Sequence, residues 1–170
     1  METRTVTLLS ATALAALVLT SGCAYYGANL RPGVSTEAEV RHDMGVPAEV
    51  YDNPDGSKLL AFPRGPLGQQ TFMAKVSSDG RLQSLEQVLN EEHFDRIVVG
   101  RTSKDEVRRL IGPPCEVMEF PRLKQIAWTY RFKDLYSRTA DFSVMLDPAG
   151  TVVRTVIVPL DTPPSPGNMP

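Results

Sequence analysis

The sequence predicts an α+β protein of two tandem helix-helix-strand-strand-strand units, with antiparallel meandering sheets and short helices packed on one face. Three observations predict this class: an internal repeat, helix boundary signals in each copy of the repeat, and alternating apolar residues after each helix. Because strands that follow one another through short turns usually pair as neighbours, the sheets should be antiparallel.

The repeat appears when the chain is aligned with itself at an offset of 67 residues. Residues 33–47 (GVSTEAEVRHDMGVP) then match residues 100–114 (GRTSKDEVRRLIGPP), with six identities in fifteen positions. Self-similarity at a fixed offset is typical of tandem structural units. We therefore assign residues 33–89 to a first, degenerate unit and residues 90–158 to a second.

Each copy of the repeat carries the signals of a short helix. A hydroxyl residue is followed three positions later by a glutamate, which predicts a capping box in each copy: Thr36 with Glu39, and Ser103 with Glu106. Gly45 and Gly112 are expected to be left-handed C-terminal caps, and the prolines that follow prevent the helix from continuing. A further helical turn is expected over residues 90–97, with Phe94 and Ile97 facing inward.

After each helix the apolar period changes to two, which indicates strands. Trp128, Tyr130 and Phe132 alternate in the second unit and should form part of the core, although an aromatic binding platform is the alternative. Turn sequences and alternation predict the remaining strands, which span residues 58–62, 72–76, 81–88, 142–146 and 151–158. A short extended piece is also expected near Val50.

The N-terminus predicts a bacterial lipoprotein. Residues 6–20 are uncharged and mostly apolar, but this stretch is shorter than the roughly twenty residues that a membrane-spanning helix needs. It runs into Leu19-Thr20-Ser21-Gly22-Cys23, which resembles a lipobox. We expect a signal peptide over residues 1–22, acylation with palmitate-type chains at Cys23, a tether over residues 23–32 and a disordered proline-rich tail over residues 159–170. A buried cysteine after a core helix is the alternative.

Composition argues against several functions. The 18 Lys and Arg against 20 Asp and Glu form no long run of one sign, so we expect no nucleic-acid partner. His42 and His93 lack the spacing of metal ligands, and no nucleotide-binding loop occurs. Cys115 should be a lone, packed thiol. We expect no catalytic residue, no metal, no nucleotide and no cofactor other than the covalent lipid, and hence no enzyme.

One group of residues in the second unit resembles a known family. The residues that carry the resemblance are a helix between two glycines, a Gly-x-Pro ending and a Trp-x-Tyr strand: Gly100, Glu106, Val107, Gly112, Pro114, Trp128 and Tyr130. They are similar to the SmpA/OmlA (BamE-like) family of outer-membrane lipoproteins, well over residues 90–158 and weakly over residues 33–88. A tandem of such units also resembles the fold of the β-lactamase inhibitor protein, which implies a concave sheet that grips a partner. Family binding residues do not transfer to a duplicated chain.

The face opposite the aromatic ladder supplies the candidate partner-binding residues. They are the residues that a simple antiparallel register displays together: Thr129, Arg131, Lys133, Ser143, Met145 and Arg154. A solvated sheet face is the alternative. Ala24, where an aspartate would favour retention in the inner membrane, makes the outer membrane the expected location, facing the periplasm. The expected function is non-enzymatic binding of an envelope protein, in outer-membrane protein assembly or envelope maintenance; an inhibitor or regulator of a periplasmic enzyme is the alternative.

Overall fold

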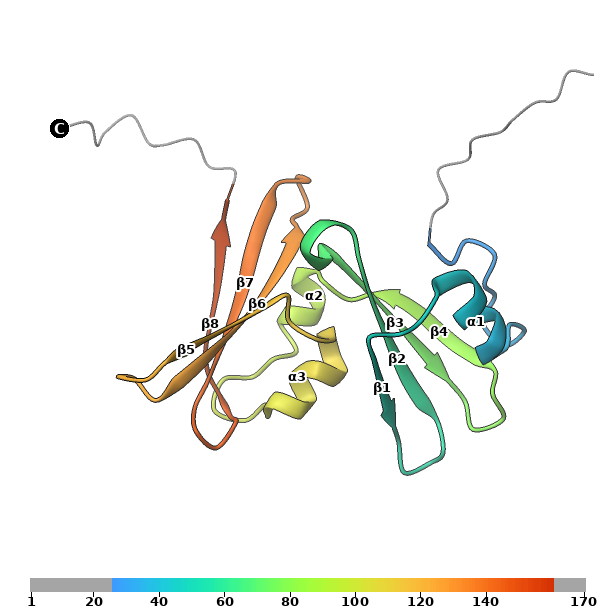
Figure 1. Cartoon of the computed structure of the whole chain (residues 1–170), viewed down its shortest axis with the longest axis horizontal. Helices are drawn as coiled ribbons and strands as arrows, with labels where there is room; N and C mark the ends of the chain where they lie inside the picture. The colour runs from blue at the N-terminus through green and yellow to red at the C-terminus, as the bar shows by residue number, and fades with distance from the viewer. Residues whose placement is uncertain (1–25, 161–170) are drawn as a thin grey trace, which may run out of the picture.

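The computed structural model describes residues 26–160 (Figure 1). The predicted signal peptide, Cys23 and the chain beyond residue 160 lie outside the described residues. This part of the chain is α+β, as predicted. Its helical elements are short: α1 (Glu37–Met44), η1 (Pro66–Gly68), α2 (Glu91–Phe94) and α3 (Lys104–Ile111).

The strands form two separate antiparallel sheets, and neighbours in sequence are neighbours in each sheet. The first sheet has the order β1 (Glu49–Asp52), β2 (Lys58–Arg64), β3 (Gln70–Val76) and β4 (Leu82–Gln87). The second has the order β5 (Glu116–Phe120), β6 (Gln125–Lys133), β7 (Thr139–Leu146) and β8 (Val152–Pro159). The expected three strands per unit are therefore too few. The extended piece expected near Val50 is a strand of the sheet, β1. Strand β5 is not expected from the sequence, because it is an edge strand whose residues are largely exposed and show little apolar alternation.

Both predicted capping boxes are present. The carboxylates of Glu39 and Glu106 accept a hydrogen bond at 2.7 Å from the backbone N–H of Thr36 and Ser103, and each hydroxyl accepts one at 3.3 Å in return. The glycine caps differ from expectation: Gly112 has φ 79° and ψ −167°, and Gly45 is similar. This positive-φ region lies outside the left-handed helical one and is essentially reserved for glycine. Both helices thus end in a sharp extended turn.

The segment before each helix is fixed to the last hairpin of its own sheet by the same hydrogen bonds. These bonds are Gly33 N–Leu82 O (2.7 Å) and Leu82 N–Ser35 O (2.8 Å) in the first half, and Gly100 N–Val152 O (2.7 Å) and Val152 N–Thr102 O (2.9 Å) in the second. One isolated bridge accompanies each set, Thr36 with Arg81 and Ser103 with Thr151. Each eight-residue helix is therefore held across its own sheet.

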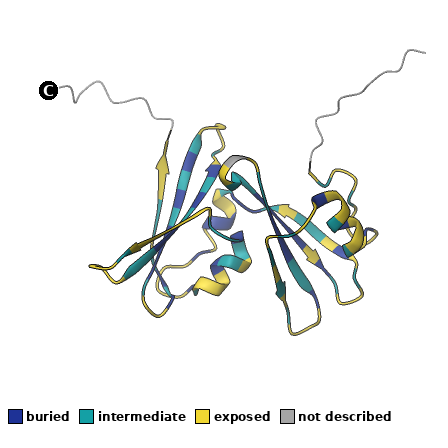
Figure 2. Ribbon diagram, viewed as in Figure 1, coloured by how far each residue is buried: buried dark blue, intermediate teal, exposed yellow. Residues whose placement is uncertain are grey.

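The elements stack in layers, with α2 and α3 lying between the two sheets (Figure 1). On α1, Val40 and Met44 pack against one face of the first sheet, beside Leu60 and Phe62. The other face of that sheet packs against α2 and α3, which also cover the second sheet. The first sheet thus has helices on both faces, whereas we expected them on one. Burial follows this order, with the buried residues between the layers (Figure 2).

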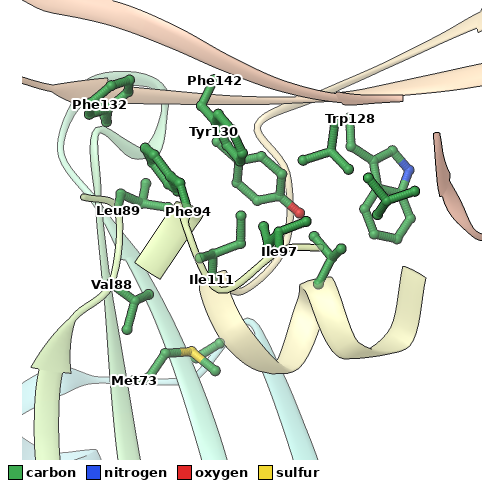
Figure 3. Packing of buried hydrophobic residues seen from close by; sticks show 14 of the residues in the cluster. Met73, Val88, Leu89, Phe94, Ile97, Ile111, Trp128, Tyr130, Phe132 and Phe142 are labelled. Atoms are coloured by element: carbon green, nitrogen blue, oxygen red, sulfur yellow. The ribbon is translucent and has the colours of Figure 1, made fainter. Parts of the chain in front are cut away.

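A single apolar cluster crosses the boundary that the sequence suggests at residue 90. Met73 of the first sheet and Val88, directly after β4, lie in the same cluster as Ile111 and the aromatic residues of the second sheet (Figure 3). Phe94 is buried as predicted and stacks on Phe142 with 4.0 Å between ring centroids. At the rim, Arg108 on α3 forms a 2.5 Å ion pair with Glu49 on β1. The two halves therefore share one hydrophobic core and are not separate domains.

Candidate functional site: the open face of the second sheet

The two faces of the second sheet differ in character. Trp128, Tyr130 and Phe132 are buried against the central helices, which confirms that the aromatic ladder is core. The Tyr130 hydroxyl donates a hydrogen bond to the Gly112 carbonyl at 3.2 Å, so even its polar atom has a partner inside the protein. The ladder is therefore not a binding platform, and the opposite face is the one open to solvent.

The predicted partner-binding residues meet on that opposite face. The antiparallel register pairs Thr129 with Ser143 on the central strands, and it pairs Met145 with Arg154 on β7 and β8. Met145 is only 6% exposed, so it supports the surface without offering much of its side chain. Lys133 stands at the end of β6, and its ammonium donates a hydrogen bond to the Thr139 hydroxyl at 2.7 Å. We call this surface the open face.

A charge pair that the sequence did not predict, Arg131 with Asp141, lies at the centre of the open face. Arg131 on β6 lies directly opposite Asp141 on β7 and donates two hydrogen bonds, Nε–Oδ1 at 2.8 Å and Nη2–Oδ2 at 2.9 Å. These hydrogen bonds to the Asp141 carboxylate raise the pKa of the guanidinium further above its usual value. Bidentate arginine–carboxylate pairs hold both side chains in one plane. The open face thus presents a fixed polar centre with both signs of charge.

The corresponding surface of the first sheet is already occupied. Ala61 and Met73 pair at the middle of its two central strands, as Thr129 and Ser143 do in the second sheet. Ala61 and Met73 are buried among residues of α3, whereas Thr129 and Ser143 are partly exposed. The same side of the sheet is therefore apolar and covered by a helix in the first half. In the second half it has a polar centre beside the exposed apolar residues Met118 and Val158, and nothing in the described chain covers it.

The other chemically interesting side chains do not assemble into a reactive centre. Cys115 is exposed, which corrects the expectation of a packed thiol, and its Sγ donates to the Thr129 carbonyl at 3.2 Å. Exposure follows from its place between a diproline and the edge strand β5. His93 is buried on α2, with Nδ1 2.9 Å from Asn90 Oδ1 and Nε2 3.6 Å from a Glu86 carboxylate oxygen.

Within residues 26–160 there is no group of three or more His, Cys, Asp or Glu side chains able to hold a metal ion. In the same range, no helix has the length and apolar character needed to cross a membrane. Comparison of the chain with family models, with curated proteins and with solved structures gives no significant match.

Proposed function

We propose that this chain is a non-enzymatic outer-membrane lipoprotein, anchored through Cys23 and facing the periplasm, that binds an envelope protein through the open face. The observation that carries the binding role is the contrast between the sheets. The matching surface of the first sheet holds a helix, whereas the open face holds a fixed Arg131–Asp141 pair that no part of residues 26–160 covers. The lipobox-like segment before Cys23 supports the anchor.

The two halves are, in this proposal, tandem units of the BamE-like kind. The repeat at an offset of 67 residues supports this, together with the matched capping boxes and matched bonds from each helix to its own last hairpin. In repeat proteins the terminal unit presents a polar outer surface while internal units pack through apolar ones. The polar centre of the open face fits such a terminal position.

Recognition of a protein fits the chemistry of the open face better than recognition of a small molecule. Small ligands are usually held in concave, mostly apolar pockets, whereas the open face offers hydroxyls, a charge pair and the cations Lys133 and Arg154 spread over three strands. A partner that matches the Arg131–Asp141 pair gains orientation from it, because complementary charges fix the register of an interface. The expected role is in outer-membrane protein assembly or envelope maintenance.

Crosslinking in intact envelopes followed by affinity purification of the full chain tests this proposal. Recovery of outer-membrane assembly subunits, reduced by charge reversal at Lys133 and Arg154, would support it. Recovery of one soluble periplasmic hydrolase would favour the alternative hypothesis that the protein inhibits or regulates a periplasmic enzyme, which the tandem arrangement suggests. Identical recovery with the charge-reversed variant would contradict binding through the open face.

A further inference from the structure

Four exposed apolar side chains lie along one side of the molecule, next to the Lys133 end of the open face. They come from η1, from the tip of the hairpin between β6 and β7, and from the residue after β8: Leu67 (61% exposed), Leu135 (85%), Tyr136 (78%) and Leu160 (45%). These segments lie along the upper side in Figure 1, and the hairpin tip is coloured as exposed in Figure 2. The Leu160 backbone N–H donates to the Thr139 carbonyl, which places Leu160 beside the hairpin. We call these four residues the apolar edge.

The chain enters the described structure on the same side. The Arg64 guanidinium lies 5.3 Å from the centre of the Tyr26 ring, and Arg64 is three residues before Leu67. Cys23 precedes Tyr26 by three residues, and an extended residue spans at most about 3.6 Å, so the chain length allows at most about 11 Å between the two residues. An acyl group on Cys23 would therefore hold this side of the protein close to the bilayer.

Backbone geometry and charge at the apolar edge also suit a lipid surface. Leu67 has φ 56°, a left-handed conformation that a bulky residue rarely adopts, and its side chain is displayed outward. Lys133 and Arg138 flank the hairpin tip, while the Asp134 carboxylate is largely buried and paired with Arg138 at 2.8 Å. Apolar and tyrosine side chains beside cations are typical of segments that sit in the headgroup region of a membrane.

We propose that the apolar edge rests in the headgroup region of the phospholipid bilayer that holds the anchor. The inference rests on the proposed function, since it needs an acylated Cys23. Two contacts, the acyl chains and the edge, would then fix the orientation of the domain where the tether alone would leave it free to rotate. With the upper side in Figure 1 against the membrane, the open face of the second sheet would point parallel to the membrane surface. It would then meet partners that lie along the membrane.

Fluorescence quenching on vesicles tests the inference with a matched pair of variants. The acylated mature protein carries one added tryptophan, either Tyr136→Trp or, as the control, Leu123→Trp. Each variant is bound to vesicles of phosphatidylethanolamine and phosphatidylglycerol. The acyl chains of these lipids bear bromine near the headgroup, which quenches the fluorescence of a tryptophan at that depth. Leu123 is 62% exposed in the hairpin between β5 and β6, whose tip projects to the left in Figure 1, away from the upper side. Trp128 is common to both variants and gives the same background. We expect severalfold stronger quenching of the added tryptophan at position 136.

The possible failures are distinguishable. The intact mass of the purified protein reports whether acyl chains are present. Protein without them would overturn the anchor and this inference together. Acylated protein in which positions 136 and 123 are quenched equally would overturn the inference alone and leave the proposed function standing.

Discussion

Gly112, which ends α3, lies against Thr71 on β3 of the other sheet: a Cβ on Gly112 would stand 2.8 Å from Thr71 Cγ2. Distances below 3.0 Å are essentially never seen for a Cβ, so only glycine fits here. Gly45 ends α1 with nearly the same backbone angles, but the nearest atom to its Cβ position is 4.0 Å away. The two glycines therefore share a backbone requirement, and Gly112 alone has a packing requirement between the two halves.

Substitution of the two glycines by alanine separates these requirements. Gly45→Ala should lower the free energy of unfolding by about 1–3 kcal/mol, the usual cost of a residue in this backbone region. Gly112→Ala should cost more, by a further 1–3 kcal/mol or so, because overpacking is added to the backbone cost. Urea denaturation measures both. If Thr71→Ala, which removes the clashing methyl, does not recover part of the loss in Gly112→Ala, the packing explanation is wrong.

The helix ends could be predicted from the sequence because their determinants are local. A hydroxyl and a glutamate three residues apart, or a glycine before a proline, act within one turn. The edge strand β5 was missed because Val117 and Met118 are both exposed, so no alternation marks it. The packing of α3 on the first sheet was missed for another reason: nothing near Gly112 in the sequence points to Thr71, forty-one residues earlier.

The candidate site shows the same limit. Period-two alternation placed Thr129 and Arg131 on one face correctly, since it depends on a single strand. Asp141 could not be recognised as the partner of Arg131 without the register between β6 and β7, which depends on the turn that joins them.

The Arg131–Asp141 pair predicts unequal effects for two neighbouring cations. Arg131→Glu should lower the free energy of unfolding by about 1–2 kcal/mol, because it faces a second carboxylate across the strands and leaves Asp141 unpaired. Lys133→Glu, at an exposed position, should change it by no more than about 0.5 kcal/mol. Chemical denaturation compares them. The exchanged double variant Arg131→Asp with Asp141→Arg should recover most of the loss, and equal effects of the two single reversals would contradict the account.

The capping box of α3 predicts a dependence of stability on acid. Hydrogen bonds from the Ser103 backbone and hydroxyl lower the pKa of Glu106 from its ordinary 4.5. A lowered carboxyl pKa contributes stability that is present above the ordinary pKa and is lost as the pH falls through the folded value. Urea midpoints should therefore decline below about pH 4.5, and less steeply in Glu106→Gln, which cannot ionise. Asp105→Asn, one residue earlier on the same helix, is the control. A Glu106→Gln profile as steep as that of the unchanged protein would refute this role.

The anchor predicts different outcomes for the two cysteines. Cys23→Ser should abolish incorporation of labelled palmitate and release the protein from the membrane fraction, because one thiol carries the lipid. Cys115→Ser, which removes an exposed thiol from the folded part, should leave both unchanged. Labelling in growing cells followed by fractionation measures this. Undiminished labelling of the Cys23→Ser protein would exclude lipidation at that residue.

Binding through the open face is the central claim, and site-specific photocrosslinking in intact envelopes tests it most directly. One protein carries the photoreactive residue at Arg154, exposed on the open face, and a matched protein carries it at Gln83, exposed on the first sheet. We expect a discrete adduct with an envelope protein from position 154, weakened by Arg131→Glu, and none from position 83. No adduct from position 154, or the same adducts from both positions, would contradict the claim that the open face is the partner surface.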